Sequence, residues 1–495
     1  MPDTLQRTDL KSLLSDPSLV ETRAYVAGEW VEPDATFAVD NPARGDIIAE
    51  VADCTREHAK TAIDAAYDAQ KDWAARTAKE RCNILKAWFD LMMANQEDLA
   101  IIMTAEQGKP LAEAKGEVAY GASFVEFFAE EAKRIYGETI PGHQPDKRIT
   151  VLRQPVGVAA SITPWNFPNA MITRKAGPAL AAGCAFVAKP AAETPLSALA
   201  LGVLAGRAGI PEGVLSILPS TDASGMGKEF CENPKVRKLT FTGSTEVGRT
   251  LLRQAADQVM KCSMELGGNA PFIVFDDADL TDAVEGAMAC KYRNNGQTCV
   301  CANRIYVQSG IHDAFVEALA ERVKAMKVGD GMEGADLGPL IAEKAVEKVA
   351  RHVDDAVSKG ATLVTGGKPS DQGPLFYEPT IVTGATQDMA FAQEETFGPF
   401  APIVKFETED EAIAMANDTI FGLAAYLYAR DAGIITRVSE ALEYGIVGIN
   451  TGIISTEVAP FGGMKQSGLG REGSRHGIDE FLEMKYTCLS VPPAR

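Results

Sequence analysis

The sequence is short of the residues from which metal sites and disulfide frameworks are built. Its five histidines lie at 58, 143, 312, 352 and 476, and its nine cysteines include no repeated CxxC pair. An odd cysteine count without a histidine cluster argues against both a structural zinc site and a disulfide framework. We therefore expect no metal centre, and we expect most cysteines to be reduced residues of the core.

Long apolar runs and an excess of basic charge are also missing. The longest nearly apolar run, 176–188, contains Pro178 and is too short to cross a bilayer. The first twenty residues lack the basic start and apolar stretch of a signal peptide, so we expect a cytoplasmic protein. The 68 acidic and 48 basic residues give a formal charge of -20, which argues against nucleic acid or a membrane as a partner. A few buried arginines could still admit a small anionic substrate.

The order of the segments predicts an α/β fold. Residues 56–136 have the apolar spacing of amphipathic helices, and from 156 onward short apolar strands (VGVAASI, CAFVAK, GVLSIL, RKLTFTG and CSMELGG) alternate with helices. This alternation is typical of a parallel, doubly wound sheet, which binds ligands at the carboxyl ends of its strands. A second alternating series follows 265, so we expect two large α/β units in the 495 residues. A polar stretch at 137–148 predicts a boundary or a protruding hairpin.

One cysteine stands in a setting that suits a nucleophile. The segment NNGQTCVCANR (294–304) places Cys299 in a loop of small polar residues between a predicted helix and a predicted strand. A thiol in such a loop is more easily exposed and ionised than one in the core, as nucleophilic catalysis requires. Because an isolated cysteine is more often a core residue, this hypothesis needs support from other segments.

Three further segments offer roles that complement a thiol. Glu265 closes the predicted strand of MELGGNAP and could act as a general base if burial raises its pKa. Asn166, at the end of another strand in TPWNFP, could donate its amide to an oxyanion. In FTGSTEVG a strand leads through a tight turn into a helix whose N-terminus could hold a phosphate. Taken singly, these segments are equally compatible with a solvated glutamate, a turn asparagine and an ordinary connection.

Together the four segments, in this order, resemble the aldehyde dehydrogenase superfamily. TPWNFP, FTGSTEVG, MELGGNAP, GQTCVCANR, EETFGP (394–399) and PFGGMKQSGLGRE (460–472) are similar to its motifs, and the resemblance extends from about residue 24 to 490. It implies a Rossmann-type cofactor-binding domain (1–136 and 150–264) and an α/β catalytic domain (265–474). It also implies a small β element (137–149 and 475–495) that bridges the subunits of a homo-oligomer, either a dimer or a tetramer.

The resemblance assigns a role to each candidate residue. It implies that Cys299 attacks the aldehyde, that Asn166 and the Cys299 backbone N–H hold the thiohemiacetal oxyanion, and that Glu265 activates the water that hydrolyses the thioester. It further implies that a nicotinamide cofactor takes the hydride. The residues that it places around this cofactor are Trp165, Lys189, Ala192, Gly243, Ser244, Glu395 and Phe397.

The segment KPAAETP bears on the choice of cofactor. In the family, a glutamate three positions after the lysine favours NAD, whereas a small residue leaves room for the 2'-phosphate of NADP. Here that position is Ala192, and Glu193 follows one place later. The resemblance therefore favours NADP, with NAD as the alternative, because Glu193 could turn inward and repel a phosphate.

Two arginines indicate the substrate class. Arg174 and Arg293 resemble the pair that binds the distal carboxylate in succinate-semialdehyde dehydrogenases, and Ser455 resembles a third contact. The expected reaction is oxidation of succinate semialdehyde to succinate with reduction of NAD(P). Without this role, Arg174 would be a surface cation and Arg293 a charge at a helix C-terminus. Cys301, two residues after the nucleophile, is a candidate redox partner, as in relatives with a reversibly oxidised Cys-x-Cys.

Three alternatives stay open. The first is a dehydrogenase for glutarate semialdehyde or another ω-oxo acid, because one methylene changes the fit to a pocket by only about 1 to 3 kcal/mol. The second is a cofactor-independent thiol hydrolase that uses Cys299 and Glu265, which would leave the GSTEVG turn unexplained. The third is a non-catalytic binding protein, in which Cys299→Ala would change nothing measurable.

Overall fold

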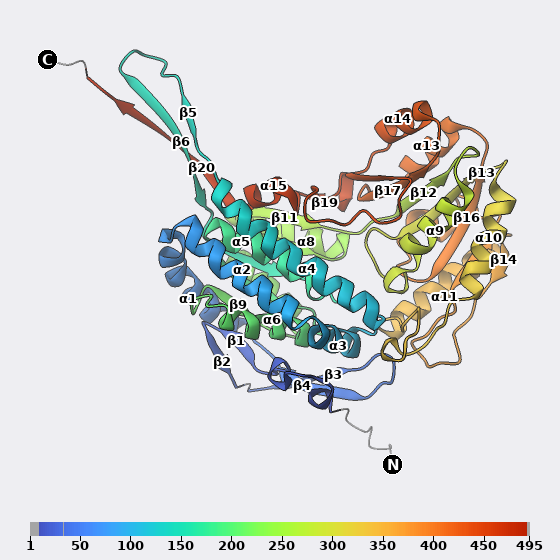
Figure 1. The fold of residues 1–495 in the computed structure, drawn as a ribbon, viewed down its shortest axis with the longest axis horizontal. Coiled ribbons are helices and arrows are strands. Elements are labelled where there is room, and N and C mark those ends of the chain that lie inside the picture. The colour runs from blue at the N-terminus through green and yellow to red at the C-terminus, as the bar shows by residue number, and fades with distance from the viewer. Residues whose placement is uncertain (1–8, 33, 493–495) are drawn as a thin grey trace.

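The computed structural model describes residues 9–32 and 34–492, which form three sheets of three or more strands and one two-stranded pair (Figure 1). Residues 1–8, 33 and 493–495 lie outside the described residues, together with the parts of the predicted N-terminal segment and C-terminal element that fall on them. Helices pack around the two larger sheets, and the third sheet projects from the body of the molecule.

The first sheet has eight strands in the order β19-β11-β10-β7-β8-β9-β1-β2. Its parallel central strands are those predicted from the alternation: β7 (Val158–Ile162), β8 (Ala185–Lys189), β9 (Leu215–Ile217), β10 (Val236–Thr242) and β11 (Lys261–Glu265). Antiparallel strands form the edges: β1 (Ala24–Val26), β2 (Glu29–Val31) and β19 (Gly468–Leu469).

Successive side chains of a strand point to opposite faces of the sheet. Because both sets are apolar in the central strands, helices cover both faces. Phe186 and Ala188 of β8 join one core, and Ala185 and Val187 join the other. The first core lies under α2 (Ala78–Ala94), α3 (Gln96–Gln107), α4 (Leu111–Glu131), α5 (Ala170–Ala182) and α6 (Pro195–Arg207). The second lies under α1 (Arg56–Ala75), α7 (Ala223–Glu232) and α8 (Thr245–Ala255). The doubly covered parallel sheet confirms the predicted α/β class.

The second sheet has seven strands in the order β14-β15-β16-β13-β12-β17-β18. Its strands are β12 (Ala270–Val274), β13 (Ala302–Gln308), β14 (Thr362–Thr365), β15 (Thr380–Thr383), β16 (Phe400–Phe406), β17 (Ala424–Tyr428) and β18 (Ile446–Ile449). One face packs on α9 (Leu280–Lys291) and α10 (His312–Lys324). The other packs on α11 (Glu343–Ser358), α12 (Ala390–Gln393), α13 (Glu409–Asn417) and α14 (Ala432–Ala441).

The third sheet consists of β5 (Glu138–Ile140), β6 (Lys147–Pro155) and β20 (Leu482–Ser490). The predicted hairpin is therefore present, but its second strand continues to Pro155, because β20 pairs with β6 over its whole length. A separate pair joins β3 (Thr36–Asp40) to β4 (Ile47–Ala52).

The chain after β18 returns to the first sheet, where β19 pairs with the end of β11 before the short helix α15 (Ser474–Gly477). The predicted second unit, 265–474, thus contributes a strand to the first sheet. Within 9–32 and 34–492, no helix is long and apolar enough to cross a membrane. The same residues contain no group of three or more side chains suited to hold a metal ion.

Candidate active site

Cys299 lies in a tightly held turn between the 3-10 helix Arg293–Gly296 and β13. The three residues 294–296 have φ values of 50°, 56° and 73°, and non-glycine residues adopt such values only where the surroundings hold them. The buried side chain of Gln297 supports the turn by accepting a hydrogen bond from Ile341 N at 3.0 Å. The thiol is therefore presented by a fixed backbone.

The thiol of Cys299 is partly exposed, and burial raises its pKa to about 12. The positive charges of Arg174 and Arg293 lower this pKa, and the negative charges of Glu395 and Glu265 raise it. Burial thus favours the protonated thiol, and the two arginines are the groups that favour its thiolate.

Asn166 follows β7 and lies against the nucleophile turn. Its Nδ2 donates to Gln297 O at 3.0 Å, and an amide nitrogen carries a second hydrogen that can serve an oxyanion. The backbone carbonyl oxygen of Asn166 accepts a hydrogen bond from Lys109 Nζ at 2.7 Å. The buried Lys109 also pairs with Glu117, which accepts from two backbone N–H groups at the start of α5. Sequence reasoning missed both residues, because Lys109 lies in the connection between α3 and α4 and Glu117 lies on α4, far from any motif.

Glu265 ends β11, between Thr242 of β10 and Gly468 of β19. Its side chain is buried, and its Oε2 has no hydrogen-bond partner within the described part of the chain. Burial raises the pKa of this carboxyl well above its ordinary value, and the charge of Glu472 raises it further, while Arg174 lowers it. A carboxylate of high pKa is a stronger base, which suits the predicted activation of water.

Arg174, expected to bind substrate, forms an ion pair inside the protein. Its guanidinium lies 2.7 Å from Glu472 and stacks over Phe461 at 4.1 Å. The second carboxylate oxygen of Glu472 contacts Lys175, whose ammonium donates to Thr242 Oγ1 at 2.6 Å. Glu472 is the last residue of the motif PFGGMKQSGLGRE, and sequence reasoning gave it no role of its own. Arg174 therefore faces the site with its charge partly neutralised.

Arg293 differs from Arg174, because it forms no ion pair with any carboxylate of residues 9–32 and 34–492 and stacks over Phe167 at 5.0 Å. Close to both arginines lies Tyr120 of α4, whose buried hydroxyl makes no regular hydrogen bond within the same residues. Ser455, the third expected substrate contact, is beside this hydroxyl. Sequence reasoning missed Tyr120, because an aromatic residue on an amphipathic helix is usually a core residue.

The predicted cofactor residues mostly surround one cavity of about 430 Å³. Its lining includes Trp165, Asn166, Gly243, Ser244, Leu266, Cys299, Glu395 and Phe397. Leu266 directly follows Glu265 in the sequence. Glu395 accepts from Gly268 N at 3.1 Å, and burial raises the pKa of its carboxyl to about 7. Phe397, with a positive φ of 59°, places its ring edge-on to Trp165 at 5.7 Å.

Lys189 and Ala192 lie farther along the same edge of the first sheet. Lys189 ends β8, and burial lowers the pKa of its ammonium, while nearby carboxylates, Glu193 first, raise it. Glu193 is exposed and lines the 430 Å³ cavity. Ala192 lines an adjoining cavity of about 570 Å³, which also includes Glu193. The small side chain expected at this position therefore lies next to an acidic residue.

Cys301 is buried, and it is free of any disulfide, like every other cysteine of the described chain. Its thiol donates to Lys291 O at 3.3 Å, and its charge raises the pKa of the neighbouring Cys290. In this conformation Cys301 thus faces α9, and a bond to Cys299 would require the turn to rearrange.

Comparison with known proteins shows a family, two curated relatives and a crystal structure to which this chain is similar. Residues 30–487 match the Aldehyde dehydrogenase family. The chain is 62% identical to glutarate-semialdehyde dehydrogenase of Pseudomonas aeruginosa, over 96% of this chain and 99% of that protein. It is 59% identical to the NADP(+) succinate-semialdehyde dehydrogenase of Escherichia coli K12, over 97% of this chain and all of that protein (100%). A crystal structure of aldehyde dehydrogenase from Brucella melitensis biovar abortus 2308 superposes with a TM-score of 0.96 at 62% identity, covering 97% of this chain and 99% of that one.

Proposed function

This chain belongs to the aldehyde dehydrogenase family and is an oxidoreductase, and on that basis we propose that it oxidises succinate semialdehyde to succinate with reduction of NADP. Family membership sets aside the thiol hydrolase and the non-catalytic binding protein. The observation that carries the substrate proposal is the group formed by Arg293, Ser455 and the hydroxyl of Tyr120 beside the nucleophile's pocket.

The distal carboxylate of the substrate is proposed to bind to this group. Arg293 supplies a positive charge that no ion pair of the described chain neutralises, although it also acts on the nearby carboxyl of Glu113, whose pKa burial raises and Arg293 lowers. Arg174 supplies less, since Glu472 already lies 2.7 Å from its guanidinium. Ser455 and Tyr120 add neutral donors, and a charge-assisted bond from an arginine is about twice as strong as a neutral one. An aldehyde without a terminal anion would leave these donors unmatched.

The proposed chemistry uses three residues of the chain. Cys299 loses its thiol proton to solvent and adds as the thiolate to the aldehyde carbon, and the resulting oxyanion is held by the second hydrogen of the Asn166 amide and by the Cys299 backbone N–H. A nicotinamide cofactor bound in the cavity would supply the acceptor for the hydride of the thiohemiacetal carbon. Glu265 then takes a proton from water, whose oxygen attacks the thioester carbon and releases the acid and the Cys299 thiolate.

The cavity has features that fit a dinucleotide. Gly243 and Ser244 stand where β10 meets the N-terminus of α8, and a Cβ on Gly243 would lie 2.4 Å from the ring of Phe241. Backbone N–H groups at a helix start suit a pyrophosphate. Ala192 leaves space near Lys189, which favours NADP, but Glu193 also lies close by. We therefore expect a modest preference for NADP over NAD.

Glutarate semialdehyde is the second candidate substrate. The relative named glutarate-semialdehyde dehydrogenase is 62% identical to this chain, and the relative named succinate-semialdehyde dehydrogenase is 59% identical. The two aldehydes differ by one methylene, which changes binding by about 1 to 3 kcal/mol in a fitted pocket. We propose that both react and that the shorter one has the higher kcat/KM.

We also propose a homo-oligomer assembled through the third sheet. β20 is an edge strand of that sheet, and its large apolar side chains, Met484, Tyr486 and Leu489, are exposed. A free strand edge with apolar side chains suits pairing with a second copy of the chain. The mass of the particle in solution distinguishes a dimer from a tetramer.

The deciding experiment follows reduced nicotinamide with succinate semialdehyde, glutarate semialdehyde and butanal, each with NADP and with NAD. We expect both semialdehydes to react faster than butanal and NADP to react faster than NAD. Cys299→Ala serves as the inactive control. Absence of aldehyde-dependent reduction with either cofactor would contradict the proposal, and a higher kcat/KM for glutarate semialdehyde would replace the proposed substrate with the second candidate.

A further inference from the structure

Two buried asparagines stand where the segments of the nucleophile and of the base enter the second sheet. Asn269 follows Glu265 by four residues and immediately precedes β12. Asn303 follows Cys299 by four residues and is the second residue of β13. Because β12 and β13 pair in parallel from their first residues, the two asparagine side chains lie next to each other.

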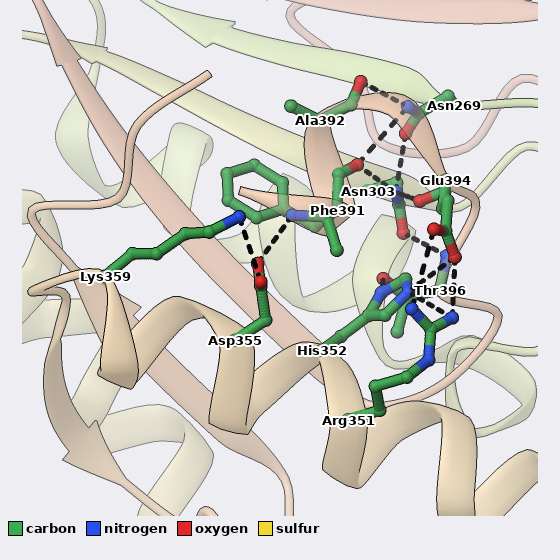
Figure 2. Close-up of polar contacts among 11 residues, drawn as sticks. Asn269, Asn303, Arg351, His352, Asp355, Lys359, Phe391, Ala392, Glu394 and Thr396 are labelled. Carbon is green, nitrogen blue, oxygen red and sulfur yellow. Dashed lines mark hydrogen bonds and ion pairs between the residues drawn. The ribbon is translucent and has the colours of Figure 1, made fainter. Parts of the chain in front are cut away.

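Asn303 holds the segment that follows α12, and Asn269 holds α12 itself and bonds to Asn303 (Figure 2). Asn303 Nδ2 donates to Asn269 Oδ1 at 2.5 Å and to the carbonyls of Phe391 and Glu394, both at 3.2 Å. Asn303 Oδ1 accepts from Thr396 N at 3.0 Å. Asn269 Nδ2 donates to Phe391 O at 3.3 Å and to the next carbonyl at 2.9 Å. Every polar atom of the two side chains is therefore used, which fixes both amide orientations.

His352 of α11 holds the same segment from the opposite side (Figure 2). Its Nδ1 lies 2.9 Å from Thr396 Oγ1, and its Nε2 lies 3.3 Å from a carboxylate oxygen of Glu394, which also pairs with Arg351 at 2.6 Å. The ring is fully buried, and burial lowers its pKa, which favours the neutral form. A neutral ring that donates from Nε2 to the carboxylate accepts the Thr396 hydroxyl at Nδ1.

The residues 394–397, here called the cofactor loop, are thus fixed on both sides. Glu395, Thr396 and Phe397 line the 430 Å³ cavity, and Thr396 is at the same time one of the anchored residues. Glu395 reaches Gly268 N, three residues after the base, and Phe397 keeps a positive φ of 59° that its surroundings must enforce. The polar network therefore ties this loop to the segments of Cys299 and Glu265.

We propose that Asn269, Asn303 and His352 are positioning residues, which fix the cofactor loop against the two catalytic segments and so set the affinity for NADP. None of the three lines the cavity. They act through the loop: a loop displaced by even about 1 Å would move the groups that hold the cofactor away from the nucleophile. That the loop holds the nicotinamide end is part of the proposed function.

Thr396→Val tests this role with the smallest change, because it removes the hydroxyl that faces His352 and keeps the N–H that Asn303 accepts. We expect the dissociation constant of NADP, measured by quenching of tryptophan fluorescence, to rise about fivefold to thirtyfold, together with the KM for NADP. Hydrolysis of 4-nitrophenyl acetate without cofactor needs only the thiol and its neighbours, and it should stay within about twofold. Thr396→Ser, which restores the hydroxyl, should restore the affinity.

Two further variants complete the experiment. His352→Gln keeps a donor near Glu394 and loses the contact with Thr396, so it should weaken NADP binding in the same way even if Thr396→Val does not fold. Asp355→Asn is the matched control on α11, since Asp355 accepts from Ala390 N and contacts Lys359, outside the cofactor loop. It should leave the affinity for NADP unchanged.

The outcomes separate this role from the proposed function. NADP affinity that is equal in Thr396→Val, His352→Gln and the wild type would overturn the positioning role, and so would an equal loss of ester hydrolysis, which would indicate general damage to the fold. A wild-type protein that reduces neither NAD nor NADP with any aldehyde would instead overturn the proposed function.

Discussion

Glu265 illustrates how single residues of this site obtain their chemistry from distant parts of the chain. Its pKa is raised first by burial and then by Glu472, more than 200 positions later in the sequence. Arg174 and Lys175, which pair with Glu472, oppose this rise. The base and its charged neighbours therefore titrate as a group, and a change at Glu472 should alter the pH dependence of the hydrolytic step.

The pKa of Cys299 gives a testable pH dependence. Because it is raised to about 12, the thiolate fraction should grow about tenfold with each pH unit between 7 and 10. The rate of alkylation by iodoacetamide, measured without cofactor, should rise in the same proportion. Cys299→Ala corrects for other thiols, in particular the exposed Cys488. A plateau of the rate below pH 9 would show that the thiol ionises much more easily.

Tyr120→Phe removes only the hydroxyl near Arg174 and Arg293. We expect kcat/KM for succinate semialdehyde to fall about tenfold to a hundredfold, mainly through KM, because a hydrogen bond to a charged group contributes about 1.5 to 3 kcal/mol. Butanal, which lacks the carboxylate, should react as in the wild type and serves as the internal control. Equal losses for both aldehydes would assign Tyr120 to the shape of the pocket instead.

Among the elements, the connection from β10 to α8 sets the position of the predicted phosphate site. Ser244 caps α8 by accepting from Val247 N at 3.3 Å, and Gly248 lets the first turn of the helix approach Leu266. Leu266 directly follows the base and lines the cavity. The second glycine of GSTEVG is thus required for close packing of the helix against the end of β11.

Gly248→Ala should disturb this packing, since a Cβ there would lie 2.4 Å from a methyl carbon of Leu266. We expect the stability to fall by about 1 to 3 kcal/mol, the usual cost of overpacking, and the KM for NADP to rise more than the KM for the aldehyde. Thermal unfolding and steady-state kinetics measure both effects. Thr250→Ala, on the exposed side of α8, is the control. Unchanged kinetics in Gly248→Ala would show that Leu266 moves aside freely.

At the scale of the whole molecule, the third sheet projects from the body and leaves large apolar side chains uncovered (Figure 1). Met484 and Tyr486 are 70% and 61% exposed, on one face of an edge strand. Isolated exposed apolar residues are common, but several of them on a projecting strand are typical of an interface.

Replacing Met484 and Tyr486 together by lysine should therefore lower the mass of the particle in solution, because charges on the strand oppose pairing with a second copy. Light scattering coupled to size exclusion measures this mass. Val259→Lys is the matched control, since Val259 is a 92% exposed apolar residue that is not part of the third sheet. An unchanged mass in the double variant would place the interface elsewhere.

Much of the fold could be predicted from local patterns in the sequence. The parallel strands of the first sheet follow apolar segments that the alternation identified, whereas its edge strands β1, β2 and β19 were not predicted. Glu265 ends one of the predicted strands, Asn166 follows another, and Cys299 precedes a strand of the second sheet. Their proximity could not be read from spacing, because it depends on how two sheets meet. Glu472 reaches Arg174 only because the chain after β18 returns to the first sheet as β19.

The sequence by itself determined the types of the elements, the order of the motifs and the family, since these depend on neighbouring residues and on short patterns. Only the tertiary structure decided which charges are neutralised and which polar groups lack a partner. Arg174 pairs with Glu472, Arg293 pairs with no carboxylate of the described chain, and the hydroxyl of Tyr120 is left beside both arginines. The physical reason is that electrostatic energies depend on distance and burial, which are set by residues that lie far apart along the chain.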